Sequence, residues 1–157
     1  MTDSIKDIEE ELPRLQDESK ADYDSKIASD VETRGIRVRA VARYMPEHSS
    51  PEQERYFFSY RIVISNEGSE PAQLLSRHWI IIDSDGKRNE VQGPGVVGHT
   101  PRLEPGEHFE YSSFCPLETD FGTMEGSYTM TTDEGEEFEA RVARFYLAMN
   151  APAPAED

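Results

Sequence analysis

The fold is decided by an alternating stretch of the chain, Ile36-Arg37-Val38-Arg39-Ala40-Val41-Ala42-Arg43-Tyr44. Apolar or aromatic residues occupy every even-numbered position, and three of the four odd positions are arginine. Because successive side chains of a strand point to opposite faces of its sheet, a period of two predicts a half-buried strand. One face of this strand would join a core, and the other would carry charge.

The same period recurs along the rest of the chain. Residues 56–64 form the next predicted strand, and residues 73–83 are apolar on both faces around Trp79, which predicts a central strand. Four more strands are predicted, the last of them with a bulge near Ala143, at residues 87–92, 107–114, 126–132 and 137–147. Seven strands without intervening helices indicate an all-β antiparallel sandwich like that of immunoglobulin or fibronectin type III domains.

Composition divides the chain into three parts. Residues 1–30 are acidic, and we expect a flexible or partly helical extension there, because one short apolar stripe (Ile5, Ile8, Leu12, Leu15) is interrupted by Pro13. The sandwich domain is predicted at residues 31–149. The proline-rich residues 150–157 are expected to be disordered.

The charge and cysteine content exclude several classes of partner and environment. The formal net charge is −16 over 157 residues, so nucleic acid is not an expected partner, since phosphate binding needs a basic face. No apolar run approaches the roughly 20 residues that span a bilayer, and the N-terminus has no secretory signal pattern, so a cytoplasmic protein without membrane insertion is predicted. The single cysteine, Cys115, is expected to be a buried thiol.

A glycine motif suggests a phosphate site at Gly93-Pro94-Gly95-Val96-Val97-Gly98, which spells G-x-G-x-x-G. In dinucleotide-binding folds this motif opens a helix, but Pro101 and Pro105 follow it here and argue against one. Gly93, Gly95 and Gly98 could still turn backbone N–H groups toward an anion or pyrophosphate, with Arg102 as the nearby cation. The alternative, which the sequence favours, is a loop that needs positive φ and close packing, because the motif's other residues offer few donors.

An arginine stripe, Arg37, Arg39 and Arg43, lies on the outward positions of the first strand. It is a candidate interaction surface for phosphate groups or an acidic peptide. The alternative is that cross-strand carboxylates, with Glu137 and Glu139 as candidates, pair with the stripe, or that it keeps an edge strand soluble.

No catalytic or metal-binding pattern stands out from the sequence. The four histidines have no ligand spacing, and no nucleophile stands beside a base. We therefore expect no metal site, no cofactor and no enzymatic activity.

Four linked motifs occur in order: Gln73-Leu74-Leu75-Ser76-Arg77-His78-Trp79, Glu90-Val91-Gln92 followed by the glycine motif, Pro101-x-Leu103-x-Pro105-Gly106, and Gly122-Thr123-Met124-x-Gly126-x-Tyr128. Residues 34–149 resemble the ApaG family through these motifs. The resemblance implies a fibronectin type III-like or immunoglobulin-like sandwich, an association with cobalt and magnesium homeostasis, and protein interaction or pyrophosphate binding. The acidic N-terminal extension departs from the short N-terminus of that family.

The expected function is therefore a non-catalytic binding module for an unidentified protein partner. The alternatives are nucleotide or pyrophosphate binding by the loop at residues 93–98 and weak divalent-metal binding by the acidic surface. Open sheet edges are compatible with a monomer or a homodimer.

Overall fold

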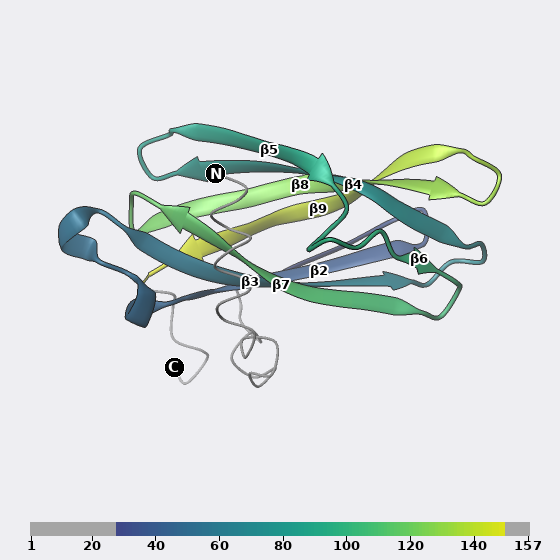
Figure 1. The fold of residues 1–157 in the computed structure, drawn as a ribbon, viewed down its shortest axis with the longest axis horizontal. Coiled ribbons are helices and arrows are strands. Elements are labelled where there is room, and N and C mark those ends of the chain that lie inside the picture. Colours follow the sequence, from purple (N-terminus) through teal and green to yellow (C-terminus); the bar gives the residue numbers. More distant parts are fainter. Residues whose placement is uncertain (1–27, 150–157) are drawn as a thin grey trace.

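Two antiparallel sheets packed face to face make up the computed structural model, which describes residues 28–149 (Figure 1). The first sheet has the order β1-β2-β3-β7, with bounds Ser29–Thr33, Ile36–Tyr44, Tyr56–Asn66 and His108–Leu117. The second sheet has the order β5-β4-β8-β9, with bounds Arg88–Pro94, Ala72–Asp83, Phe121–Thr132 and Glu137–Ala148. A two-residue strand, β6 (Arg102–Leu103), also pairs with β4. The predicted antiparallel β-sandwich is confirmed.

Each of the seven predicted strands overlaps a strand of the structure. Strand β4 is an interior strand between β5 and β8, and its Trp79 is 2% exposed, as expected for a central strand. The predicted bulge is also present, because the register of β8 and β9 sets Ala143 and Arg144 opposite Glu125 alone. This bulge restores the inward direction of the apolar side chains at the end of β9.

The domain boundary differs from the prediction, because β1 begins at Ser29, inside the stretch assigned to the extension. This strand is short and mostly polar, so its own pattern is weak, and it forms by pairing with β2, with Val31 opposite Val38. Strand β8 likewise starts earlier than predicted, at Phe121. The expected N-terminal helix and the tail at residues 150–157 lie outside the described residues.

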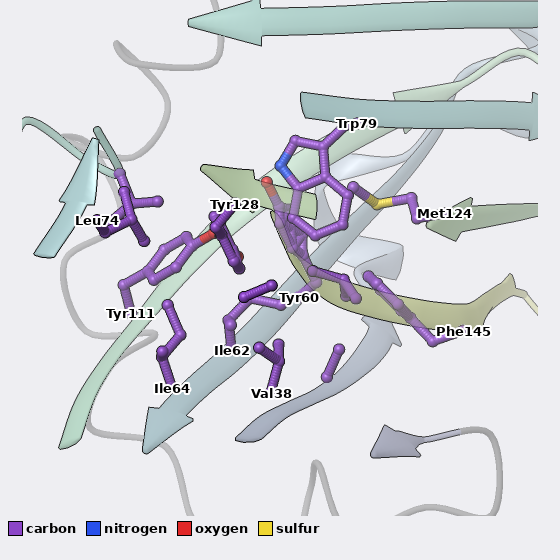
Figure 2. Close-up of a cluster of buried hydrophobic side chains, with 14 of the residues drawn as sticks. Val38, Tyr60, Ile62, Ile64, Leu74, Trp79, Tyr111, Met124, Tyr128 and Phe145 are labelled. Atoms are coloured by element: carbon purple, nitrogen blue, oxygen red, sulfur yellow. The ribbon is translucent and has the colours of Figure 1, made fainter. Parts of the chain in front are cut away.

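Aromatic and β-branched side chains from both sheets fill the core (Figure 2). Trp79 meets Tyr128 and Phe145 edge to face, with ring centroids 6.0 Å apart in both pairs. Burying one such side chain stabilises the fold by roughly 1.5–3 kcal/mol. Cys115 is buried in the same core, as predicted, and burial raises the pKa of its thiol to about 12.

A second, smaller apolar cluster lies on the outward side of the first sheet. Met45, Phe57 and Phe114 form it, beside the loop that carries the short 3-10 helices η3 (Pro46–His48) and η4 (Pro51–Gln53). No helix within residues 28–149 is long and apolar enough to span a membrane.

Candidate functional site

The glycine loop, residues 93–99, is tied down by its own backbone. The N–H of Gly95 donates to the carbonyl of Leu75 at 2.8 Å, and Val96 and His99 exchange two backbone hydrogen bonds of 2.8 Å each. The Val96 side chain is fully buried in the main core. The loop therefore closes the space between the sheets at the end of β5.

Close packing restricts two of the loop glycines, Gly93 weakly and Gly95 strongly. A Cβ on Gly93 would lie 3.1 Å from Nη2 of Arg77, and one on Gly95 would collide with the carbonyl oxygen of His99. Gly98 has open space around its Cα but a φ of +81°, which an L side chain rarely adopts. The alternative raised from the sequence, positive φ and close packing, thus explains glycine at positions 95 and 98, whereas at position 93 a Cβ would meet only the end of the Arg77 side chain.

Arg77 is the cation at the base of this loop, and sequence reasoning did not single it out. Its Nη1 donates to the carbonyl oxygens of Pro94 at 3.0 Å and Gly95 at 2.9 Å. It shares the inward side of β4 with Trp79, and its charge acts on the buried Tyr128, whose pKa is raised by burial. The sequence feature that could have pointed to Arg77 is that it is the only arginine in the mostly apolar stretch 74–82.

The tip of the loop is a tight turn from Val96 to His99 in which both central residues have positive φ. Val97 has a φ of 47° and Gly98 one of 81°, the signs of a type I′ turn. Val97 is 37% exposed, so an apolar β-branched residue lies at the surface on a strained backbone. The His99 ring packs on Phe109 of β7 at 5.7 Å, which fixes the far side of the turn to the first sheet.

Few N–H groups of the loop remain for a ligand. Pro94 has none, and those of Gly95, Val96 and His99 are used by backbone carbonyls. The N–H groups of Val97 and Gly98 have no acceptor among residues 28–149.

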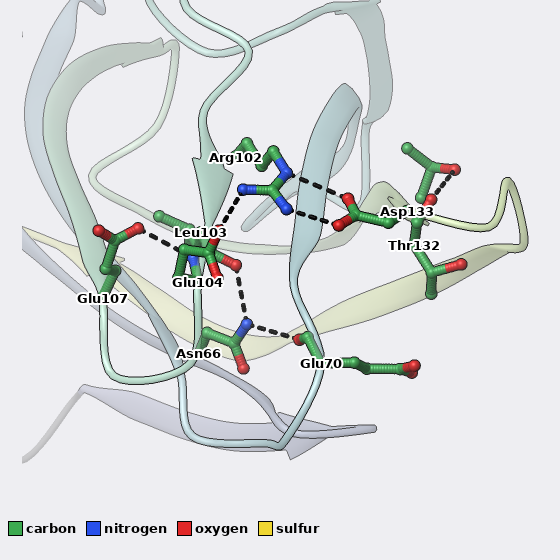
Figure 3. A network of polar contacts seen from close by, with 9 residues as sticks. Asn66, Glu70, Arg102, Leu103, Glu104, Glu107, Thr132 and Asp133 are labelled. Carbon is green, nitrogen blue, oxygen red and sulfur yellow. Dashed lines mark hydrogen bonds and ion pairs between the residues drawn. The ribbon is translucent and has the colours of Figure 1, made fainter.

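Arg102 lies on β6, where two carboxylates engage it (Figure 3). Its Nε and Nη2 contact Asp133 at 3.0 and 2.5 Å, and its Nη1 contacts Glu104 at 2.6 Å. The hydrogen bond from Arg102 lowers the pKa of Asp133, and the same bond raises the pKa of Arg102. The cation proposed for the glycine loop from the sequence is thus held by the turn between β8 and β9.

The arginine stripe keeps its predicted outward direction, but its partners differ from those named. Arg37 binds Asp30 of β1 at 2.6 Å and Glu67 at 3.3 Å. The suggested partner Glu139 instead accepts hydrogen bonds from Ser127 and Thr129 on the second sheet. Strand β2 is also not an edge strand, because β1 covers its free side, so the edge explanation is wrong.

Metal-binding residues do not gather in the part of the chain that the structure describes. No group of three or more His, Cys, Asp or Glu side chains within it is arranged to hold a metal ion. The four histidines are spread over the loop 45–55, β4, the glycine loop and β7.

A family model for the ApaG domain matches residues 46–132. The chain belongs to the ApaG family. Protein ApaG of Anaeromyxobacter dehalogenans strain 2CP-C is 52% identical over 117 residues, which are 74% of this chain and 92% of that protein. Protein ApaG of Methylorubrum extorquens strain PA1 is 57% identical over 116 residues, 74% of this chain and 89% of the relative.

The ApaG fold also has a close counterpart among solved structures. The crystal structure of the putative ApaA protein from Bordetella pertussis superposes with a TM-score of 0.71 at 51% identity. The superposition covers 73% of this chain and 93% of that one. The described ApaG domain therefore shares both sequence and architecture with that protein.

Proposed function

We propose that this ApaG domain is a non-catalytic protein-binding module whose partner contacts the tip of the glycine loop at Val97. The observation that carries the proposal is the strained, exposed position of this valine, which has a φ of 47° and is 37% exposed. A left-handed backbone costs an L residue roughly 1–2 kcal/mol, and glycine at this position would avoid that cost. Strain of this kind is most often kept where function uses it.

The surroundings of Val97 support presentation to a partner. Val96 on one side is buried in the core, and the ring of His99 on the other packs against Phe109. Arg77 holds the carbonyls that lead into the turn. A loop anchored in this way loses little conformational entropy on binding, which favours affinity.

Affinity capture with the full chain tests the proposal, using the wild type, Val97→Gly and a control, Phe121→Thr. The control removes another exposed large apolar side chain, 40% exposed, on the outward side of the second sheet. We expect Val97→Gly to lose a protein that the wild type and the control both retain. Capture of the same proteins by all three would contradict the proposal.

A second candidate function is binding of a nucleotide pyrophosphate by the same loop. Arg77 favours it, because this guanidinium has no carboxylate partner among residues 28–149 and lies at the base of the loop. The N–H groups of Val97 and Gly98 would be the backbone donors. Arg102, named from the sequence, could take part only by leaving Asp133.

Calorimetry with ATP, GTP and pyrophosphate tests this second candidate. Binding should weaken about tenfold in Arg77→Met, since loss of a charge-assisted hydrogen bond costs about 1.5–3 kcal/mol. Arg102→Ala separates the two candidate cations. Absent binding, or binding that neither substitution changes, would remove the candidate.

The third candidate is weak divalent-metal binding by the acidic surface. Carboxylates that are not shaped into a cage bind hard cations loosely. The family resemblance implies an association with cobalt and magnesium homeostasis. In the leading proposal, the protein partner would provide that link. A melting temperature that falls when a chelator is added would favour direct metal binding instead.

A further inference from the structure

Strand β5 presents an open backbone edge at the outer side of the second sheet (Figure 1). Five of its seven residues are exposed. The edge strand of the first sheet on the same side, β7, is buried from Tyr111 to Cys115. On the other side of the sandwich, β1 and β9 lie next to each other, since the N–H of Arg141 donates to Oγ1 of Thr33. Among residues 28–149, β5 is therefore the most exposed edge strand.

The backbone of β5 directs alternate N–H groups away from β4. At one end of the pairing, the N–H of Asp83 donates to the carbonyl of Lys87, and at the other end the N–H of Gly95 donates to β4. Because hydrogen-bonded pairs alternate with non-bonded pairs in an antiparallel ladder, the odd-numbered residues between these ends bond to β4. The N–H groups on the free side belong to Arg88, Glu90 and Gln92. None of the three has an acceptor within residues 28–149.

The features that keep many edge strands unpaired are weak in β5. Its register with β4 runs without a bulge, and its only proline is its last residue, Pro94. Its charged residues, Arg88 and Glu90, contact each other at 2.6 Å and so neutralise one another. Edge strands that avoid pairing commonly carry a bulge, an interior proline or unpaired charges. The free edge of β5 can therefore accept an extended peptide as an added strand.

A pocket of about 360 Å³, here called the end pocket, lies beside the start of this edge, between β5 and the end of β7. Ile81, Pro116 and Leu117 supply its apolar lining. Asn89 also lines it and lies opposite Ile81 in the register of β4 and β5. Residues that face each other across paired strands point to the same side of a sheet. A peptide residue opposite Asn89 would therefore direct its side chain into the end pocket.

The rest of the end pocket is polar. Arg55 lines it and makes no side-chain hydrogen bond or ion pair with another residue of the described range. Lys87 contacts Glu118 at 3.4 Å, and both side chains are more than half exposed. These groups can bind a hydroxyl while the apolar lining contacts a ring. A side chain with an apolar body and a polar tip, such as tyrosine, fits this combination.

We propose that the protein partner adds an extended strand to the free edge of β5 and anchors one amphipathic aromatic side chain in the end pocket. Carbonyl groups of the added strand accept the N–H groups of Arg88, Glu90 and Gln92. The strand reaches the glycine loop, because β5 leads directly into that loop after Pro94. This inference rests on the proposed protein-binding function and adds the conformation of the partner and a second contact region.

Selection from a library of random seven-residue peptides, the length of β5, tests the inference with the full chain as the target. We expect the enriched peptides to share a period of two and an aromatic residue at one of the alternating positions. No enrichment, or enriched sequences without that period, would overturn the proposal.

Two variants of Gln92 test where an enriched peptide binds. Gln92→Pro removes one N–H of the free edge and places a ring in the path of the peptide, whereas Gln92→Ala keeps the N–H. Since β4 does not use this N–H, both variants should fold, which chemical denaturation checks. In calorimetry, Gln92→Pro should weaken peptide binding about tenfold or more, and Gln92→Ala should bind like the wild type. Equal affinity of Gln92→Pro and the wild type would argue decisively against strand addition.

Hydrogen exchange of the wild-type chain gives a readout that does not depend on how the variants fold. The peptide should slow exchange at Arg88, Glu90 and Gln92. Slowed exchange at Val97 alone, with binding lost in Val97→Gly but kept in Gln92→Pro, would overturn strand addition and leave the proposed function standing. The reverse pattern would support strand addition and remove the contact at Val97.

Sedimentation of the chain without peptide tests a second copy as the occupant of the edge. We expect the wild type and Gln92→Pro to have the same oligomeric state. A dimer that Gln92→Pro converts to a monomer would mean that β5 of a second copy pairs with this edge, and it would overturn the peptide partner.

Discussion

The hydroxyl of Tyr111 lies 2.6 Å from the hydroxyl of Tyr128, and this buried contact joins the two sheets through the centre of the core. Tyr111 belongs to β7 and Tyr128 to β8, so the bond links elements that no backbone ladder connects. Each hydroxyl is the partner of the other, and burial raises the pKa of both phenols. Neutral hydroxyls at this position can donate and accept without placing a charge in the core.

Tyr128→Phe should destabilise the domain by about 1–3 kcal/mol, because it leaves the hydroxyl of Tyr111 buried without a partner. Replacing both tyrosines with phenylalanine should cost less than the sum of the two single substitutions. Chemical denaturation of the four proteins in this cycle measures the coupling. Strictly additive losses would show that the hydroxyls do not depend on one another.

Gly95→Ala and Gly98→Ala should differ clearly in stability. A Cβ at position 95 meets the backbone of His99, whereas one at position 98 meets nothing within 4 Å. We expect a loss above about 2 kcal/mol for Gly95→Ala, from strain and overpacking together. The left-handed backbone at Gly98 should cost about 1 kcal/mol. Thermal and chemical unfolding give the order, and equal losses would contradict the packing role of Gly95.

Arg77→Met should loosen the glycine loop while keeping the length of the side chain. The carbonyls of Pro94 and Gly95 lose their donor, which predicts a loss of about 1–3 kcal/mol and faster hydrogen exchange at Val96 and His99. Arg77→Lys is the matched control, since an ammonium can still donate to one of these carbonyls. If the two variants exchange as slowly as the wild type, the guanidinium does not hold the loop.

Asp133→Asn should flatten the pH dependence of stability on the acid side. The pKa of Asp133 is lower in the folded chain than its ordinary value, because Arg102 donates to it. The contribution of the pair is therefore present above about pH 4 and is lost as the pH falls through the lowered folded pKa. Unfolding curves from neutral to acid pH measure this, and high salt should shrink the difference because both groups are exposed.

The strands and their inward faces could be predicted because their signal is local. The two apolar faces around Trp79, which predict a central strand, and the parity change near Ala143 are both visible in the sequence, and the central strand and the bulge are found in the structure. Strand β1 could not be predicted in the same way, because its polar residues become a strand only through pairing with β2.

The site was predicted less fully, because its contacts are long-range. The glycines of the loop were identified from the sequence, but the long-range contacts were not. Arg77, which donates to the carbonyl of Pro94, lies 17 residues before it in the chain. Arg102 donates to Asp133, which lies 31 residues further along the chain. Such partners follow from sheet order, which the spacing of residues along the chain does not encode. The positive φ of Val97 could not be predicted from the sequence either. Valine is an ordinary strand residue, and only the turn sets its φ to 47°.

Val97→Gly should stabilise the isolated protein by about 1 kcal/mol, because glycine accepts the left-handed backbone that valine resists. The same substitution should weaken binding of a captured partner about tenfold or more, as for an anchor residue of an interface. Denaturation and calorimetry measure the two effects separately. A variant that is more stable and binds equally well would leave the strain at Val97 without a functional use.

Hydrogen exchange of the loop in the presence of the captured partner tests the central claim most directly. The N–H groups of Val97 and Gly98 have no acceptor within the described residues, so they should exchange fast in the free protein. The account predicts that the partner slows exchange at these two positions in the wild type and that Val97→Gly abolishes the change. Slowed exchange confined to another face, with Val97 and Gly98 unaffected, would contradict it.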